Sequence, residues 1–364
     1  MSRRALVLSG GGARGAYQVG VLKALSEQVE PGTQPFPIIT GISVGALNAS
    51  VLATEPEDFR AGTRKLEKIW RNLHCHHVFD ARHSAVRGRL AHWAGAFMFG
   101  WAGVGARPSL LNNDPLRDLL NEHVDFSKVN EAVGDGALDA FAITASSYAT
   151  GRAITFFNGH DRLSPWSRAR RVGRREALNC EHVVASSALP LVFPAIQIEH
   201  VYFGDGALRE SAPLSPAVHM GAESIIIIGA RDNEPDPEPD CEMEYPPVGY
   251  LAGQMLDILF NDDTQADIER ARRINSTLAL MAPENRSASP LRHVEVTNVN
   301  PSKDLRPVAG AHLDEMPGSL KFIMRAIGAL KEPWVLPSYL LFEPGYIGAL
   351  IDMGEQDGKA ILLG

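Results

Sequence analysis

Residues 5–25, ALVLSGGGARGAYQVGVLKAL, contain the pattern that decides the fold. A short apolar run leads into a glycine-rich turn, and the apolar residues Val19, Leu22 and Leu25 then fall on one face of a helix. Residues 37–54, PIITGISVGALNASVLAT, repeat the order of strand, tight turn and helix. Two such units in succession predict an α/β protein with a mainly parallel central sheet.

The rest of the chain gives further predictions of secondary structure. Apolar runs on either side of a Thr-Gly turn predict a hairpin of strands at residues 140–145 and 154–157. The fully apolar run at residues 225–228 is typical of a central parallel strand. Helices are expected at residues 185–195, ASSALPLVFPA, and at residues 257–274, where apolar residues recur with helical spacing.

Composition and charge exclude several classes of protein. The chain has 364 residues, of which 45% are hydrophobic and 21% charged, as in an ordinary folded protein. A net charge of -8 leaves no global field that would attract nucleic acid, so any membrane contact must be local. Three widely spaced cysteines form no disulfide framework, and the apolar run at residues 5–8 is too short for a signal peptide. We therefore expect a cytoplasmic protein, in peripheral contact at most with the inner membrane face.

GISVG at residues 41–45 matches the G-x-S-x-G nucleophile elbow, between an expected strand and an expected helix. Gly41 and Gly45 suit this turn because side chains there would collide with the neighbouring backbone. The elbow would lift the Ser43 hydroxyl to the edge of the sheet. Taken alone, the motif could also be a plain strand-helix turn in which the serine caps the helix.

SGGGARG at residues 9–15 supplies a second element of a catalytic site. Consecutive glycines before a helix leave backbone N–H groups free to bind a negatively charged oxygen. In acyl transfer that oxygen is the oxyanion, and one well-placed donor lowers the barrier by roughly 3 kcal/mol. We predict that Gly11 and Gly12 are the donors and that Arg14 adds positive potential nearby.

The same segment also satisfies the dinucleotide-binding pattern G-x-G-x-x-G, through Gly10, Gly12 and Gly15. That fold needs an acidic residue at the end of its second strand to hold the ribose. Here the second expected strand ends in Thr-Gly-Ile-Ser at residues 40–43, which disfavours a nicotinamide cofactor.

The third element is Asp205, which follows an apolar run and stands between Gly204 and Gly206. A carboxylate on such a tight turn can approach another loop closely and accept the proton of a serine. Because an aspartate of ordinary pKa, about 3.9, is a weak base, the site would have to be partly desolvated. The usual α/β-hydrolase fold and the malonyl-transferase-like fold do not match this sequence well. Both place the elbow later in the chain, and both use a histidine as the base. On its own, Asp-Gly is only a turn signal.

Together, these motifs resemble the patatin-like phospholipase family, whose pattern is G-G-G-x-[RK]-G, then G-x-S-x-G, then D-G-[GA]. The segment at residues 185–195 is similar to the family's A-S-x-A-x-P-x-x-F-P, and the resemblance covers about residues 5–217. It implies a three-layer α/β/α fold and a dyad of Ser43 and Asp205 without a histidine. It also implies hydrolysis of lipid acyl esters, with no metal or other cofactor. Ser211 is a departure, since many members carry asparagine there.

We therefore expect a serine lipid acyl hydrolase of the phospholipase A or lysophospholipase type, which cleaves fatty-acyl esters through an acyl-enzyme. The expected partner is a membrane phospholipid or another acyl lipid, with no nucleic acid. Two alternatives stay open: an acyltransferase that uses the same dyad, and a catalytically silent lipid-binding regulatory module. The domain division that we predict is a patatin-like catalytic domain at residues 1–230, an acidic proline-rich loop at 231–247, and a helical C-terminal extension at 248–364 packed on that domain.

Three other segments have weaker signals. The tract His74-Cys75-His76-His77 contains metal-ligand types but lacks ligand spacing, so no metal is predicted. Six arginines surround Trp166 and could bind phosphate or pair with the chain's own acids: Arg162, Arg168, Arg170, Arg171, Arg174 and Arg175. Residues 91–106, AHWAGAFMFGWAGVGA, are equally consistent with an apolar lid and with a buried helix.

Overall fold

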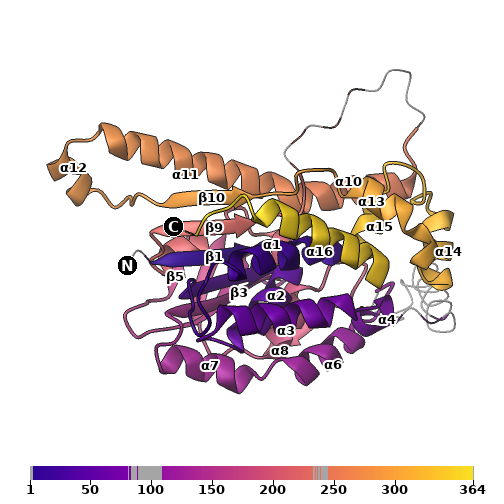
Figure 1. Ribbon diagram of the computed structural model, residues 1–364, viewed down its shortest axis with the longest axis horizontal. Coiled ribbons are helices and arrows are strands. Elements are labelled where there is room, and N and C mark those ends of the chain that lie inside the picture. Colours follow the sequence, from indigo (N-terminus) through magenta and orange to yellow (C-terminus); the bar gives the residue numbers. More distant parts are fainter. Residues whose placement is uncertain are drawn as a thin grey trace.

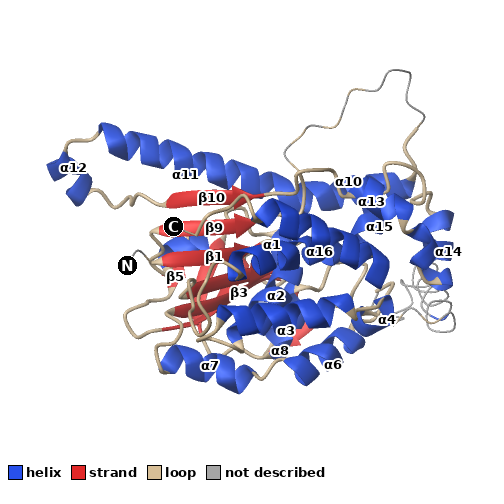
Figure 2. Cartoon of the chain, in the orientation of Figure 1, coloured by secondary structure: helices blue, strands red, loops and turns tan. Residues whose placement is uncertain are grey.

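The computed structural model describes residues 3–80, 82, 88, 109–232, 234, 236, 238 and 245–363. Within these residues, ten strands form one mixed sheet with helices on both faces (Figures 1 and 2). The order along the sheet is β10-β9-β1-β2-β3-β4-β6-β5, and β8 pairs with β3 and β7. The strands are β1 (Arg4–Leu8), β2 (Ile38–Ile42), β3 (Ala140–Ser147), β4 (Ala153–Gly159), β5 (Trp166–Ser167), β6 (Arg171–Arg175), β7 (Ile196–Ile198), β8 (Val201–Asp205), β9 (Ser224–Ile228) and β10 (Glu295–Val299).

The five strands from β10 to β3 run parallel, which confirms the predicted mainly parallel sheet. β9 lies between β1 and β10, as its apolar sequence predicted. The predicted hairpin is also present, because β3 and β4 pair antiparallel. β8 then runs antiparallel to the carboxyl end of β3, which brings a distant part of the chain to the edge where β2 ends.

Alternation along β1 explains why helices cover both faces of the sheet. Leu6 and Leu8 belong to one hydrophobic core, whereas Ala5 and Val7 belong to a second, because successive strand residues point to opposite faces. The first core includes residues of α1 (Gly15–Ser26), α2 (Val44–Ala53), α3 (Phe59–Arg71), α6 (Asp114–His123), α7 (Phe126–Gly134), α8 (Cys180–Ser186) and α16 (Pro344–Gly358). Residues of α9 (Ser215–His219) and α11 (Asp263–Leu280) contribute to the second.

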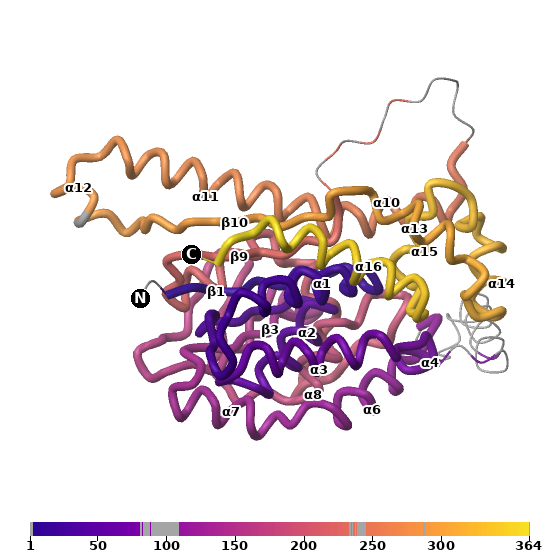
Figure 3. The backbone as a smooth tube through the Cα atoms, viewed as in Figure 1, coloured from indigo at the N-terminus to yellow at the C-terminus, as the bar shows by residue number. Residues whose placement is uncertain are grey.

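The C-terminal extension is built into this architecture. α16 packs closely on α1 because Gly20 and Gly354 face the partner helix, where a Cβ atom would collide with the carbonyl oxygens of Ile351 and Tyr17. β10 extends the sheet beyond β9. With α11 and α12 (Pro283–Ala288), β10 forms an arm that reaches out from the body (Figures 1 and 3). The other helices are α4 (Cys75–Val78), α10 (Val248–Asp257), α13 (Arg306–Ala311), α14 (Gly318–Ala326) and α15 (Val335–Leu340).

Two predictions of helices need correction. The helix expected at residues 185–195 ends at Ser186; Pro190 cannot donate a helical hydrogen bond and disfavours helical geometry before it, and Leu191 has a φ of 67°. The helix expected at residues 257–274 is part of a longer helical run: α10, a π-helical turn at Ile258–Asp262, and then α11. Across the described residues, no helix has the length and apolar character needed to cross a bilayer.

Candidate active site

Ser43 lies at a strained elbow between β2 and α2. Its backbone has a φ of 55°, in the left-handed region that residues other than glycine rarely adopt. A Cβ atom at Gly41 would collide with the carbonyl oxygen of Gly45, and one at Gly45 would collide with the carbonyl oxygen of Leu8. The two glycines that flank the serine are therefore required by the close approach of three backbone segments.

A hydrogen-bond chain from β3 holds this elbow in place. The Ser43 backbone N–H donates to Oγ of Ser186 at 2.8 Å, and the Ser186 hydroxyl donates to the carbonyl oxygen of Thr144 at 2.6 Å. Since strain at a functional turn costs about 1–3 kcal/mol, the elbow must be fixed by contacts of this kind. Ser186, the last residue of α8, therefore supports the serine.

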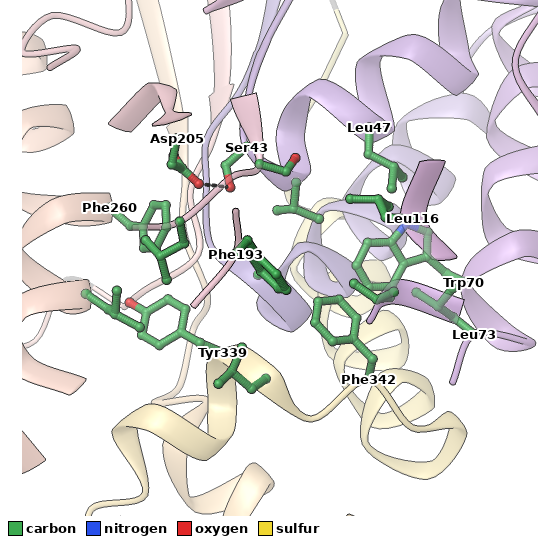
Figure 4. Close-up of a pocket in the computed structure, with 17 residues that line it drawn as sticks. Ser43, Leu47, Trp70, Leu73, Leu116, Phe193, Asp205, Phe260, Tyr339 and Phe342 are labelled. Carbon is green, nitrogen blue, oxygen red and sulfur yellow. Dashed lines mark hydrogen bonds between the residues drawn. The ribbon is translucent and has the colours of Figure 1, made fainter. Parts of the chain in front are cut away.

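Asp205 ends β8 and points to the serine (Figure 4). Its Oδ2 atom accepts the Ser43 hydroxyl at 2.6 Å, and its Oδ1 atom accepts the backbone N–H of Ala207 at 3.0 Å. A Cβ atom at Gly206 would collide with the carbonyl oxygen of Thr144, so glycine is needed next to the aspartate. No histidine among the described residues hydrogen-bonds to Ser43 or Asp205.

Burial controls the chemistry of this carboxyl group. Only 1% of Asp205 is exposed, and this desolvation raises its pKa to about 7, while the hydrogen bonds from Ser43 and Ala207 act in the opposite direction. A carboxylate with a pKa near neutrality is a far better proton acceptor than an ordinary aspartate. Desolvation of this kind is what an aspartate needs to act as a base at neutral pH.

The glycine loop lies beside the dyad. Gly12, with a φ of 54°, starts a 3-10 turn at Gly12–Arg14 and lines the same pocket as Ser43. A Cβ atom at Gly12 would collide with the carbonyl oxygen of Tyr339 in α15. At Gly10 it would lie 2.5 Å from the Phe260 ring and 3.2 Å from Cβ of Ser43.

The remaining two glycines of this loop also pack tightly. A Cβ atom at Gly11 would lie 2.6 Å from Cβ of Ala230, and one at Gly15 would lie 2.7 Å from Val44. Only glycine fits at these four positions, because the loop packs tightly between the elbow, the end of β9 and the C-terminal extension.

Arg14 is buried, and its guanidinium group forms an ion pair and hydrogen bonds with residues of α10 and α15. It forms an ion pair with Asp257 at 3.0 Å and donates to Oγ of Ser338 at 2.7 and 2.9 Å and to the Tyr339 hydroxyl at 3.0 Å. The Tyr339 hydroxyl itself donates to Asp257 at 2.6 Å, and Arg231 lies 3.3 Å from the other oxygen of Asp257. Arg14 thus ties the glycine loop to α10 and α15.

A pocket with an almost entirely apolar wall opens at the dyad (Figure 4). Ser43 and Asp205 lie at one part of it, and Trp70, Leu73 and Phe342 line the part farther away. The full lining is Gly12, Ser43, Val44, Leu47, Trp70, Leu73, Val78, Leu116, Ser187, Leu189, Phe193, Asp205, Leu256, Phe260, Tyr339, Leu340 and Phe342. Such a surface suits a hydrocarbon chain whose polar end meets the serine.

The sequence did not indicate that the C-terminal extension lines part of this pocket. Leu256, Phe260, Tyr339, Leu340 and Phe342 all line it. No motif marks these residues, because each is an ordinary apolar residue whose position depends on how α10 and α15 pack. The local signal is weak: residues 255–260 are apolar apart from Asp257, a pattern that fits a core helix equally well.

Two of the three weaker segments lie within the described residues, and both are apart from Ser43 and Asp205. Residues 91–106 are outside the described residues. The six arginines belong to the β5–β6 region at the far edge of the sheet, where Arg174 pairs with Glu176 and Glu199 and Arg175 donates to backbone carbonyls. His74 bonds to Glu343 at 2.7 Å, and no cluster within the described part of the chain has three or more side chains placed to hold a metal ion.

A serine at a strained elbow, hydrogen-bonded to a buried aspartate at the carboxyl edge of a mainly parallel sheet, has the geometry that a serine hydrolase with an aspartate base would need. Comparison with known sequences agrees with this class: the family model of patatin-like phospholipases matches residues 6–218. The chain belongs to the patatin-like phospholipase family.

Individual relatives match over short stretches. A patatin-like phospholipase domain-containing protein of Caenorhabditis elegans is 42% identical over 74 residues, which is 19% of this chain and 5% of the relative. A lysophospholipase of Aspergillus terreus is 50% identical over 52 residues, 14% of this chain and 3% of the relative. The chain therefore spans only a small part of these curated relatives.

Two solved structures resemble the fold at a distance. VipD from Legionella pneumophila shares 14% identity with a TM-score of 0.33, covering 97% of this chain and 67% of the other. Human GIVD cytosolic phospholipase A2 shares 11% identity with a TM-score of 0.42, covering 98% and 58%.

Proposed function

We propose that the protein hydrolyses fatty-acyl ester bonds of phospholipids or lysophospholipids, with Ser43 as nucleophile and Asp205 as general base. The observation that carries the proposal is the 2.6 Å hydrogen bond from the Ser43 hydroxyl to Oδ2 of a buried aspartate, at the polar end of an apolar pocket. Membership of the patatin-like phospholipase family supports a lipid ester as substrate.

The reaction would proceed in two halves. Ser43 Oγ attacks the acyl carbonyl while Asp205 takes its proton, and the Gly11 and Gly12 N–H groups stabilise the oxyanion. The tetrahedral intermediate expels the alcohol, which receives the proton from Asp205, and the acyl group stays on Ser43. Water then attacks the acyl-enzyme with Asp205 as base, so that the fatty acid leaves and the serine hydroxyl is restored.

Arg14 would act in this scheme as a positioning residue. Its charge is already paired with Asp257, and its hydrogen bonds reach α15, whose Tyr339 carbonyl lies against Gly12. Because an oxyanion hole works only when its donors are held in place before the reaction, anchoring the glycine loop would preserve the donor geometry.

Peripheral contact with a lipid surface is part of the proposal. α10 and the residue after it leave an apolar stripe exposed, formed by Val248 (69% exposed), Leu251 (44%), Met255 (70%) and Ile258 (58%). The other face of the same helix contributes Leu256 to the pocket. An uncharged stripe next to an acyl-binding pocket fits a bilayer, because a lipid must leave its aggregate to reach Ser43. In the cell, the inner membrane face would provide that surface.

A lipid panel tests the proposal. Wild-type protein and Ser43→Ala would be incubated with phospholipids, lysophospholipids and a neutral glyceride, and the released fatty acids and lysolipids would be identified by mass. We expect release of fatty acid from phospholipid or lysophospholipid by the wild type only. Equal release by Ser43→Ala, or release confined to the neutral glyceride, would contradict the proposal.

A further inference from the structure

A second pocket lies along the same edge of the sheet as Ser43. It has a volume of about 620 Å³ and is lined by Gly229, which follows β9, and by Asn298 and Asn300 at the end of β10. In the parallel order β10-β9-β1-β2, Ser43 follows β2. Neighbouring strands lie about 4.8 Å apart, so β9 and β10 lie about 10 and 14 Å from β2 across the sheet. Ligands of open parallel sheets bind at this carboxyl edge.

Phe260 separates the two pockets. Its side chain lines both of them, and Gly10 is the residue between its ring and Ser43. In Figure 4, Phe260 lies on one side of Ser43, and Trp70 and Leu73 lie on the other. Phe260 sits in the π-helical turn at Ile258–Asp262, an irregularity often found at functional sites. A substrate with its ester at Ser43 would therefore have an apolar pocket on one side and the second pocket on the other.

The second pocket differs from the first in its charge. Four carboxylates line it: Asp232, Glu234, Asp262 and Glu269. It also contains Arg231, which is paired with Asp257 and Asp236 at 3.3 Å each and with Asp232 at 4.0 Å, and Arg272. Four carboxylates against two arginines give the lining a net charge of -2. Among the described residues, no ion pair engages Glu234, Asp262 or Glu269.

An unused hydrogen-bond acceptor adds to this negative character. Oδ1 of Asn298 is buried in the described structure with no hydrogen-bond partner, and its side chain belongs to the lining. A buried acceptor without a partner is costly, so a donor from a ligand would be stabilising there. The primary ammonium of an ethanolamine headgroup has N–H donors for this acceptor. The trimethylammonium group of choline has none, so only the charge of its headgroup would be attracted by the carboxylates.

We propose that this second pocket binds the ammonium headgroup of a zwitterionic phospholipid, while the acyl chain occupies the apolar pocket and the ester lies at Ser43. The inference rests on the proposed function and adds to it a headgroup preference. The headgroup of a glycerophospholipid is several bonds from its acyl ester, and the second pocket lies a few strand spacings from the nucleophile. A headgroup with only negative charge would be repelled by the same four carboxylates.

The test compares three phospholipids with identical acyl chains: phosphatidylcholine, phosphatidylethanolamine and phosphatidylglycerol. Each is dispersed in neutral detergent micelles and incubated with wild-type protein and with the double variant Asp262→Asn, Glu269→Gln. The matched control is Glu131→Gln, Asp135→Asn, which removes two exposed charges around the end of α7. A soluble short-chain ester reports on the dyad itself.

We expect the wild type and the control to prefer the two ammonium lipids. In the pocket variant, the ratio of their kcat/KM to that of phosphatidylglycerol should fall at least about fivefold. This is a loss of about 1 kcal/mol, which two exposed ion pairs can supply. Turnover of the soluble ester should not change.

A ratio unaltered by the pocket variant, or a wild type that prefers phosphatidylglycerol, would overturn the headgroup assignment and leave the proposed function standing. Failure of the wild type to cleave any of the three lipids, with the soluble ester still hydrolysed, would overturn this inference. The proposed function would fail with it only if lysophospholipids were not cleaved either.

Discussion

The hydroxyl of Ser43 donates to Oδ2 of Asp205 across 2.6 Å, although the two residues are 162 positions apart in the chain. Two separate pieces of local structure bring them together. The glycine elbow after β2 lifts the serine out of the sheet, and the antiparallel pairing of β8 with the end of β3 places Asp205 beside Ala145. Burial then gives the aspartate its raised pKa.

The pH dependence of turnover should follow Asp205. Because burial raises its pKa to about 7, the carboxyl group is protonated and inactive as a base at lower pH. We expect kcat/KM for a soluble ester to rise as the pH increases through about 7 and then to level off. Asp205→Asn should lower turnover about 100- to 10,000-fold. A profile that is flat from about pH 5 upward would mean that an ordinary carboxylate, or another group, is the base.

Gly12→Ala should damage catalysis much more than substrate binding. The new Cβ atom would meet the Tyr339 carbonyl oxygen and displace the N–H donors of the loop, so kcat should fall at least about 100-fold with little change in KM. Gly32→Ala is the matched control, because Gly32 also has a positive φ, of 74°, but has no atom within 4 Å of the added Cβ. Equal losses in both variants would attribute the effect to backbone strain alone.

Asp257→Asn tests whether the extension holds the glycine loop. Removing the charge leaves the buried Arg14 without its ion-pair partner, which should destabilise the fold by about 3 kcal/mol and reduce kcat more than it changes KM. Asp352→Asn removes an exposed partner of Arg71 and should alter neither quantity. Thermal unfolding and steady-state kinetics measure the two effects. If Asp257→Asn unfolds more easily but retains full kcat, the network is structural and does not position the loop.

The exposed stripe on α10 should govern activity on vesicles. Replacing Met255 and Ile258 by serine removes two apolar side chains that would enter the lipid, each contributing about 1.5–3 kcal/mol when fully buried. Vesicle binding and vesicle hydrolysis should therefore fall at least about tenfold, while a soluble ester is cleaved as before. Leu280→Ser, at an exposed residue near the tip of the arm, is the control. Binding is measured by sedimentation with vesicles. If the Met255 and Ile258 variant bound vesicles as well as Leu280→Ser does, the proposed membrane contact would be wrong.

The parts of the fold that could be predicted from the sequence depend on local backbone chemistry. A strand that ends in glycines and is followed by an apolar helix has few alternatives, so β1, β2 and the elbow at Ser43 could be located without coordinates. The same holds for Asp205, since a carboxylate between two glycines indicates a close approach of backbones.

What could not be predicted depends on packing between distant segments. Nothing in the sequence around Tyr339 indicates that its carbonyl covers Gly12, or that Asp257 receives the guanidinium of Arg14. These contacts form between segments far apart in the sequence: α16 packs on α1, and α15 packs on the 3-10 turn at Gly12–Arg14. The prediction of a helix at residues 185–195 was wrong for a different reason. The apolar residues there have helical spacing, but Pro190 cannot take part in the helical hydrogen-bonding pattern.

Covalent labelling by a fluorophosphonate, mapped by mass spectrometry of peptides, tests the role of Ser43 and Asp205 most directly, because the reagent records the nucleophile without any assumption about the lipid. The wild type should carry one adduct, on Ser43. Ser43→Ala should carry none and lose ester hydrolysis while remaining folded, and Asp205→Asn should be labelled at least about 100-fold more slowly because its amide cannot accept the proton. An adduct on a different residue, or undiminished labelling of Asp205→Asn, would contradict a serine nucleophile activated by this aspartate.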